Sequence, residues 1–262
     1  MLQQLNIVLI IGSAPDSIIS REWRKDSFSN VVAINNAWRV REDWDYLIYP
    51  EDFPLENRPK KTSSDQVMIT AQEFVPAQNS FGGFVYAGGT MAFTTAYWVL
   101  AHLRSQVIAF IGCDMVYPSN GVPTHFYGTG NADPLRDDLT LQSLEAKSAR
   151  LFYLAHQNNC LCLNLSTQDE SRLVFPRISI DKLEAFKHVD YADALDNTRQ
   201  LFHAEAIGHA VKREHELSYY FDSGRYWDHL DAICPDACLK LDNLWLKGLK
   251  LDQLNSKTIA QV

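Results

Sequence analysis

Residues Val85–Tyr127, VYAGGTMAFTTAYWVLAHLRSQVIAFIGCDMVYPSNGVPTHFY, contain the pattern that decides the fold. A Gly-Gly-Thr loop comes first, and the composition of Thr90–Leu103 after it predicts a helix. The apolar, β-branched run Val107–Ile111 then predicts a buried strand, which ends at Gly112. In open α/β sheets, ligands bind outside the carboxyl ends of such strands. The segment therefore predicts an α/β protein with a binding site where this strand ends.

Further apolar runs predict the rest of the sheet. The clearest is Asn6–Ile11, and similar runs occupy Val31–Ile34, Tyr46–Tyr49, Gln66–Thr70 and Cys160–Leu165. Runs that are apolar at nearly every position are typical of strands buried on both faces of a parallel sheet. A long helix is predicted for Leu139–Asn158 from its near-helical apolar stripe. Another helix is expected to begin near Ser17, whereas residues 54–82, with Pro54, Pro59 and Pro76, show a less regular pattern. Strands that alternate with helices predict a mostly parallel, Rossmann-like doubly wound sheet.

The C-terminal third of the chain shows helical patterns and no clear strand. Helices are predicted within Asp181–Phe186, Tyr191–Tyr220 and Tyr226–Leu254, with breaks at Ser223-Gly224 and at Pro235. We therefore expect two units, a Rossmann-like nucleotide-binding domain over residues 1–178 and a helical C-terminal subdomain over residues 179–262.

Composition narrows the classes of function and location. The 262-residue chain carries a formal net charge of −8, which disfavours duplex nucleic acid as a partner. Its longest apolar run is too short to cross a membrane, and residues 1–6 do not resemble a signal peptide. The odd number of cysteines, five, fits reduced thiols. These features predict a cytoplasmic protein with no membrane span and no nucleic-acid partner, and leave a homo-oligomeric state open.

Small and polar residues follow the first two predicted strands. Gly12 and Ser13 lie in a turn that matches neither the G-x-G-x-x-G pattern nor the Walker A pattern, yet a turn of small residues lets a ligand approach the backbone. Asn35 and Asn36 follow the second strand, where an amide both donates to and accepts from a base or a sugar. The alternative interpretation is an ordinary turn in each place.

Gly88, Gly89 and Thr90 are the strongest phosphate-binding candidates in the chain. Bare backbone and a hydroxyl at the start of a helix suit an anion. The alternative is a helix N-cap without a ligand. Asp114, after the next strand, is a candidate to bind a ribose hydroxyl.

Tyr117, His125 and Tyr127 fall in the loop after the same strand. A histidine titrates near neutral pH, as a general base must, and tyrosine hydroxyls donate hydrogen bonds to a departing phosphate. The alternative for His125 is a surface histidine with no catalytic role.

Metal-ligand patterns are weak in this sequence. Glu51 and Asp52 end the third strand, where they would hold a divalent cation, provide a general base or cap a helix. Asp43-Trp44-Asp45 spells D-x-D but precedes its strand, at the wrong edge of the sheet. We therefore expect no metal ligand and no bound cofactor in the site, with Mg²⁺ as the alternative.

Three segments together resemble a known family. They are VLIIGSAPDSI (8–18), VVAINNAW (31–38) and AGGTMAFTTAYWVLAHLRSQVIAFIGCDMVY (87–117). The set is similar to the bacterial lipooligosaccharide sialyltransferases and the related hydroxymethylpterin diphosphokinase-like family, over residues 6–166. The resemblance implies contacts to a nucleotide donor and stabilisation of its leaving phosphate. It assigns these roles to Gly12, Ser13, Asn35, Gly88, Gly89, Thr90, Tyr117 and Tyr127.

Departures from the family leave the reaction open. The sialyltransferases place an Asn in the turn that here reads Gly12-Ser13-Ala14 and another near Pro50. Their catalytic histidine precedes the helix predicted here from Leu139. This chain reads Pro134-Leu135-Arg136-Asp137-Asp138 in that region. His125 or one of the two acids therefore takes the role of the base, or the reaction differs.

One main expectation and two alternatives follow. The main expectation is a sialyltransferase-like glycosyltransferase that uses a nucleotide-activated sugar, in particular a CMP-linked acidic sugar, and a glycan or small-molecule acceptor. The alternatives are Mg²⁺-dependent diphosphoryl transfer from ATP and a nucleotide-binding protein without catalysis.

Overall fold

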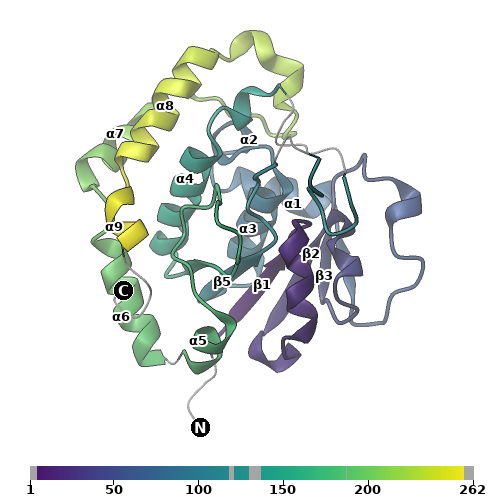
Figure 1. Ribbon diagram of the computed structural model, residues 1–262. Coiled ribbons are helices and arrows are strands. Elements are labelled where there is room, and N and C mark those ends of the chain that lie inside the picture. Colours follow the sequence, from purple (N-terminus) through teal and green to yellow (C-terminus); the bar gives the residue numbers. More distant parts are fainter. Residues whose placement is uncertain (1–4, 118–120, 130–136, 187, 257–262) are drawn as a thin grey trace.

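The computed structural model describes residues 5–117, 121–129, 137–186 and 188–256. Within them, six strands form one parallel sheet in the order β4-β3-β2-β1-β5-β6 (Figure 1). The strands are β1 (Ile7–Ile11), β2 (Asn30–Ile34), β3 (Tyr46–Ile48), β4 (Val67–Ile69), β5 (Val107–Ile111) and β6 (Leu161–Asn164). The predicted α/β class and the parallel, Rossmann-like sheet are confirmed.

The strand order reverses next to β1. Strands β2, β3 and β4 follow one another on one side of β1, whereas β5 and β6 lie on the other side. Leu9 of β1 pairs in register with Val31 of β2 and with Ala109 of β5. The chain therefore leaves β1 and β5 in opposite directions, which is the arrangement that opens a crevice at the carboxyl ends of two neighbouring strands.

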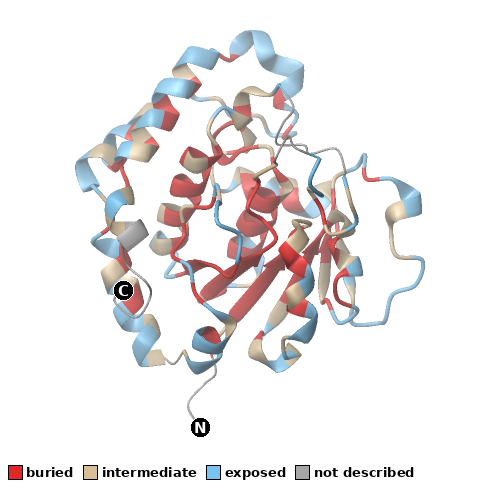
Figure 2. Cartoon of the chain, in the orientation of Figure 1, coloured by how far each residue is buried: buried red, intermediate tan, exposed pale blue. Residues whose placement is uncertain are grey.

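Side chains alternate between the two faces of the sheet, and helices cover both faces. On one face, Val8 and Ile10 pack into a cluster with α1 (Ala71–Asn79), α3 (Met91–His102) and α4 (Leu144–Gln157). On the other, Leu9 and Ile11 pack with the 3-10 helices Pro15–Glu22 and Asn35–Arg39 and with α5 (Ile180–Ala185). Figure 2 shows the sheet as the buried centre of the molecule. Burial of each such aliphatic side chain contributes about 1.5–3 kcal/mol to the free energy that stabilises the fold.

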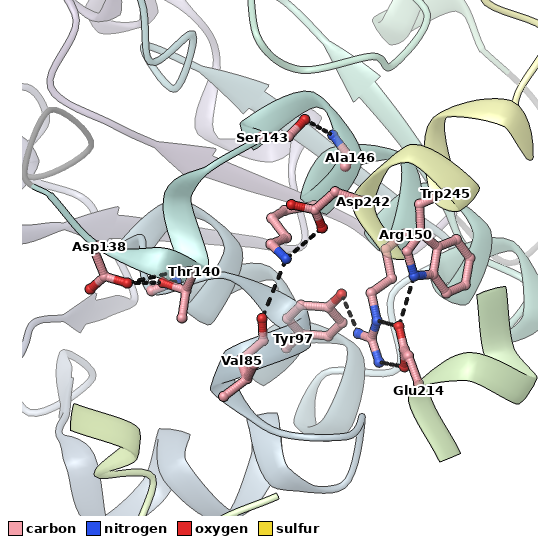
Figure 3. Close-up of polar contacts among 12 residues, drawn as sticks. Val85, Tyr97, Asp138, Thr140, Ser143, Ala146, Arg150, Glu214, Asp242 and Trp245 are labelled. Carbon is pink, nitrogen blue, oxygen red and sulfur yellow. Dashed lines mark hydrogen bonds and ion pairs between the residues drawn. The ribbon is translucent and has the colours of Figure 1, made fainter. Parts of the chain in front are cut away.

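Three helical segments differ from the sequence prediction. The residues after β1 form a 3-10 helix, Pro15–Glu22, where a helix was expected from Ser17. The helix expected from Leu139 begins later, at α4, because the hydroxyl oxygen of Ser143 accepts a hydrogen bond from Ala146 N at 3.2 Å (Figure 3). Residues 54–82, expected to be less regular, contain α1, and the short helix α2 (Phe84–Ala87) follows them.

Helix α1 forms although Pro76 lies inside it. The Glu73 carboxylate accepts the Thr70 N–H at 2.8 Å, and this capping contact satisfies a donor at the helix start. The prolines of this region indicated less regular structure, but a proline in a short helix removes only one hydrogen-bond donor, and the cap offsets part of that loss.

The C-terminal third is helical, as predicted. After α5 come α6 (His188–Arg199), α7 (Ala204–Leu217), a 3-10 helix at Tyr226–Ala232, α8 (Pro235–Lys247) and α9 (Leu251–Ser256). These helices run along one side of the molecule and expose their outer faces (Figure 1, Figure 2). None of the described helices has the length and the apolar composition needed to cross a membrane.

Two buried ion pairs join α4 to the C-terminal helices (Figure 3). Lys147 Nζ lies 2.7 Å from Asp242 Oδ1 of α8, and Arg150 Nε lies 2.7 Å from Glu214 Oε1 of α7. A hydrophobic cluster that includes Trp245 of α8 and residues of α2 and α4 surrounds them. The C-terminal helices thus share a core with the rest of the chain, and the domain boundary at residue 178 stays a prediction.

Candidate functional site

A cleft of about 450 Å³ opens at the carboxyl ends of β1, β2 and β5. The turns after these strands line it, together with the first turn of α3 and the loop after β5. Its volume lies within the range of small-molecule sites, about 300–1,000 Å³. The predicted site residues that line it are Gly12, Ser13, Asn35, Asn36, Thr90, Tyr117, His125 and Tyr127. Gly88, Gly89 and Asp114 do not line it.

Two facing glycines set the backbone of the cleft. Gly12 N donates a hydrogen bond to Ile111 O at 2.8 Å, and Ala14 N donates to Gly112 O at 3.0 Å. A Cβ added at Gly12 would lie 2.2 Å from Gly112 O, so no side chain fits between the two turns. Gly112 has φ +68°, a left-handed conformation that glycine adopts without strain. The turns after β1 and β5 are therefore in direct backbone contact.

Asn35 and Asn36 form the wall after β2. Asn35 has φ +49°, a left-handed conformation that asparagine tolerates better than most residues. The side-chain Oδ1 of each is buried and accepts no hydrogen bond from the described residues. A buried acceptor without a partner costs about 1–3 kcal/mol. Both residues line the cleft, and each leaves one amide oxygen unused by the described residues.

The Gly-Gly-Thr loop joins two helices. Gly88 N donates within the last turn of α2, and Gly89 N donates to Thr140 Oγ1 at 3.1 Å. Thr90 is the N-cap of α3, where its Oγ1 accepts from Phe93 N at 3.3 Å. Both glycine N–H groups are therefore used within the protein, and it is the first turn of α3 that presents N–H groups and partial positive charge to the cleft.

The described residues that line the cleft include neither lysine nor arginine, so they offer no side chain of these two types to a phosphate. A phosphate bound here would depend on the N–H groups of α3 and on neutral hydrogen-bond donors.

His125 lies in a tight turn that is docked on the connection after β1. His125 N donates to Gly128 O at 2.9 Å, and Gly128 N donates back to His125 O at 3.0 Å. Phe126 N donates to Ser13 O at 3.0 Å. The loop after β5 therefore returns to the cleft at a defined point.

The imidazole of His125 is buried and packs against two tyrosine rings. Its ring centroid lies 4.9 Å from that of Tyr127 and 6.0 Å from that of Tyr117. Its Nδ1 shares a hydrogen bond of 2.8 Å with Thr124 Oγ1. Burial lowers the pKa of His125 below its usual value of 6.5, so the ring is neutral at pH 7 and able to accept a proton.

Asp114 is buried behind the cleft. Its Oδ1 accepts a hydrogen bond from Asn164 Nδ2 at 3.4 Å, and its Oδ2 has no partner in the described part of the chain. Asp16, close to it, accepts from Ser166 Oγ at 2.9 Å, and burial together with the charge of Asp114 raises the pKa of Asp16. This position gives no support to the predicted contact between Asp114 and a ribose hydroxyl.

Other acids that the sequence offered as bases or metal ligands have structural partners. Asp138 Oδ1 accepts hydrogen bonds from Thr140 N at 2.8 Å and from Thr140 Oγ1 at 2.7 Å (Figure 3). Asp43 pairs with Arg41 at 2.7 Å. Within the described ranges, no group of three or more histidine, cysteine, aspartate or glutamate side chains is arranged to hold a metal ion.

One part of the lining was missed in the sequence. Phe53, Pro54 and Asn57 come from the connection after β3 and line the cleft. Trp38 Nε1 donates to Asn57 O at 2.8 Å, which holds this connection against the residues after β2. The sequence marks Phe53, Pro54 and Asn57 as lining residues only by their position after β3, because residues that follow parallel strands gather at one edge of the sheet.

Fold and cleft define a Rossmann-like α/β protein with a ligand-sized cavity at its topological switch point. Comparison with protein-family models, curated proteins and solved structures finds no match to this chain. The residues of the cleft are therefore the basis for a function.

Proposed function

We propose that the protein is a glycosyltransferase-like enzyme whose cleft binds a nucleotide-activated sugar, with a CMP-linked acidic sugar as the expected donor. One observation carries the proposal: a neutral imidazole, two tyrosines and two amides with unpaired oxygens line the same cleft. The amides suit a base or a ribose, and the first turn of α3 suits a phosphate. The histidine and the tyrosines supply the groups that glycosyl transfer requires.

In the proposed reaction, His125 is the general base. Thr124 engages Nδ1, which leaves Nε2 to take the proton from an acceptor hydroxyl. The acceptor oxygen bonds to the anomeric carbon of the sugar while the bond from that carbon to the phosphate oxygen breaks. The electron pair of the broken bond leaves with the nucleotide. Tyr117 and Tyr127 donate hydrogen bonds to the departing phosphate.

Replacing Asn35 with glycine is expected to weaken CMP binding about tenfold, the loss of roughly one amide hydrogen bond. Glycine also accepts the left-handed backbone, so the free energy of unfolding should change by less than about 1 kcal/mol. Asn159→Gly is the matched control, because Asn159 is an exposed asparagine with φ +53° after α4. Calorimetry with CMP, UMP, GMP and AMP measures both variants. A wild-type protein that binds none of the four nucleotides ends the proposal.

Replacing His125 with glutamine is expected to lower kcat about 10²–10⁴-fold, the usual contribution of a general base, with CMP affinity retained. The assay follows CMP release from a CMP-linked acidic sugar. Because burial lowers the pKa of His125, the wild-type kcat/KM should fall only below pH 6.5, as the ring becomes protonated. His156→Gln is the control, since burial also lowers the pKa of His156, which lies on α4. An unchanged kcat in His125→Gln would remove His125 from this role.

Mg²⁺-dependent diphosphoryl transfer from ATP is the second candidate, and one observation favours it. The carboxylate of Asp52 lines the cleft, where it would bind Mg²⁺ together with phosphate oxygens. Nucleotide binding that is unchanged by EDTA counts against this candidate, whereas ATP binding that requires Mg²⁺ would replace the glycosyltransferase proposal.

A further inference from the structure

A second pocket, of about 350 Å³, adjoins the cleft. Pro50, Asp52 and Met91 line both cavities, so these residues form their common border. The second pocket lies among the connection after β3, helices α1, α2 and α3, and residues 223–227 between α7 and α8. Two ligands would therefore lie side by side in the cleft and in this pocket.

The floor of the second pocket is apolar and preformed. Phe74 and Phe84 meet edge to face with ring centroids 6.5 Å apart. Gly224 packs directly on this floor with φ +72°, and a Cβ added to it would lie 2.9 Å from Phe84 Cε2. Asn79 Nδ2 donates to Asp222 O at 2.8 Å, and this hydrogen bond holds the segment between α7 and α8 against α1. The pocket thus keeps its shape without a ligand.

The rim carries an exposed indole and a net negative charge. Trp227 is 52% exposed, and the Arg225 guanidinium lies 5.5 Å from its ring centroid. Arg225 Nε also pairs with Asp228 Oδ2 at 2.7 Å, so its charge is balanced. Glu51 and Asp52 add two further carboxylates. An anion is therefore disfavoured, whereas a neutral ring with hydroxyl groups finds an aromatic face and hydrogen-bond acceptors.

We infer that this pocket binds the acceptor, and that the acceptor presents an uncharged, hydroxylated ring of the size of one sugar unit. The inference rests on the proposed function, because it assigns the second cavity to the second substrate. The ring packs on Trp227 and on the phenylalanine floor, and one hydroxyl reaches the border at Asp52. The phosphate of the donor is directed to the cleft, because the first turn of α3 attracts it there and the carboxylate of Glu51, which lines only the pocket, repels it from the pocket.

Two matched probes test the inference. Phenyl β-D-glucopyranoside and phenyl β-D-glucuronide differ at C6, where one carries a neutral CH₂OH group and the other a carboxylate. Calorimetry with the full chain is expected to show the glucoside binding at least about tenfold more tightly than the glucuronide, because the rim is negative. Combining Glu51→Gln with Asp52→Asn should bring the two affinities to within about threefold of each other.

Trp227 supplies the site-specific test. Trp227→Ala should weaken glucoside binding about tenfold or more, and Trp227→Phe should restore most of the loss, because phenylalanine keeps an aromatic face. Trp23→Ala is the control, since Trp23 packs against Phe28 and does not line either cavity. Glucoside affinity should be unchanged in that variant.

The outcomes separate this inference from the proposed function. CMP binding without glucoside binding, or glucoside binding that Trp227→Ala leaves intact, overturns the inference and leaves the donor site standing. A glucuronide that binds as tightly as the glucoside also overturns it. Glucoside binding that depends on Trp227, in a protein that binds no nucleotide, overturns the acceptor role together with the proposed function.

Discussion

Replacing Arg150 with methionine is expected to lower the free energy of unfolding by about 3–5 kcal/mol, as found when one partner of a buried ion pair is removed. Arg150 Nε and Nη2 donate to the two carboxylate oxygens of Glu214 at 2.7 and 2.8 Å, and Nη1 donates to Tyr97 OH at 2.9 Å (Figure 3). Without the guanidinium, the Glu214 carboxylate keeps, among the described residues, only the hydrogen bond from Trp245 Nε1 at 2.8 Å. Urea denaturation followed by circular dichroism measures the loss.

Two comparisons identify the cause of this loss. Arg172→Met breaks a pair of similar length, 2.6 Å to Glu145, whose side chains are 48% and 35% exposed. Its expected cost is below about 1 kcal/mol, because water already screens the charges. The double variant Arg150→Met with Glu214→Met should recover much of the lost stability, since neither charge remains buried. If the double variant is as unstable as the single one, lost packing and not an unpaired charge is responsible.

The same ion pair bears on the second pocket. Glu214 belongs to α7, and residues 223–227, which form one wall of the pocket, follow this helix. Tyr86 OH donates to Glu214 O at 2.9 Å and accepts from Tyr219 N at 2.7 Å. Because Tyr86 belongs to α2, these two hydrogen bonds also fix the end of α7 to α2. Loss of Arg150 should therefore affect the second pocket more than the cleft, whose turns belong to β1, β2 and β5.

The sheet was predictable because its signal is local. Strands buried on both faces are apolar at nearly every position, so Val107–Ile111 was predicted with the bounds that β5 has. β1 differs from its prediction, Asn6–Ile11, by one residue. The gathering of Ser13, Asn35 and Thr90 in one cleft also followed from sequence, because parallel strands place their carboxyl ends at one edge.

The partners of individual polar groups were not predictable, because they depend on contacts between distant segments. Gly89 N is engaged by Thr140, 51 residues further along the chain. Asp114 turns toward Asn164 of β6, 50 residues away, and so is buried behind the cleft. Nothing in the neighbouring residues distinguishes such a buried position from an exposed one. The irregular connection after β3, which supplies Phe53, carries no periodic pattern at all.

Replacing Gly12 with alanine is expected to lower the free energy of unfolding by about 3 kcal/mol, at the upper end of the usual cost of overpacking. The new Cβ would lie 2.2 Å from Gly112 O and 2.7 Å from Cys113 Sγ. Gly112 has little room to yield, because its own Cα faces Ser17: a Cβ there would lie 2.6 Å from Ser17 Cβ. The turns after β1 and β5 must therefore separate. Urea denaturation measures the cost.

Gly208→Ala is the matched control and should have the opposite sign. Gly208 lies inside α7 and is exposed, and apart from its chain neighbours and the backbone of its own helix, no described atom would lie within 4 Å of an added Cβ. Alanine there should stabilise the protein by about 0.5–1 kcal/mol, since glycine loses more backbone entropy in a helix. Gly12→Ala should also weaken CMP binding, because Ser13 O accepts the hydrogen bond from Phe126 N that positions the His125 turn. If Gly12→Ala leaves both the stability and the CMP affinity unchanged, the shape of the cleft does not depend on backbone contact between the turns after β1 and β5.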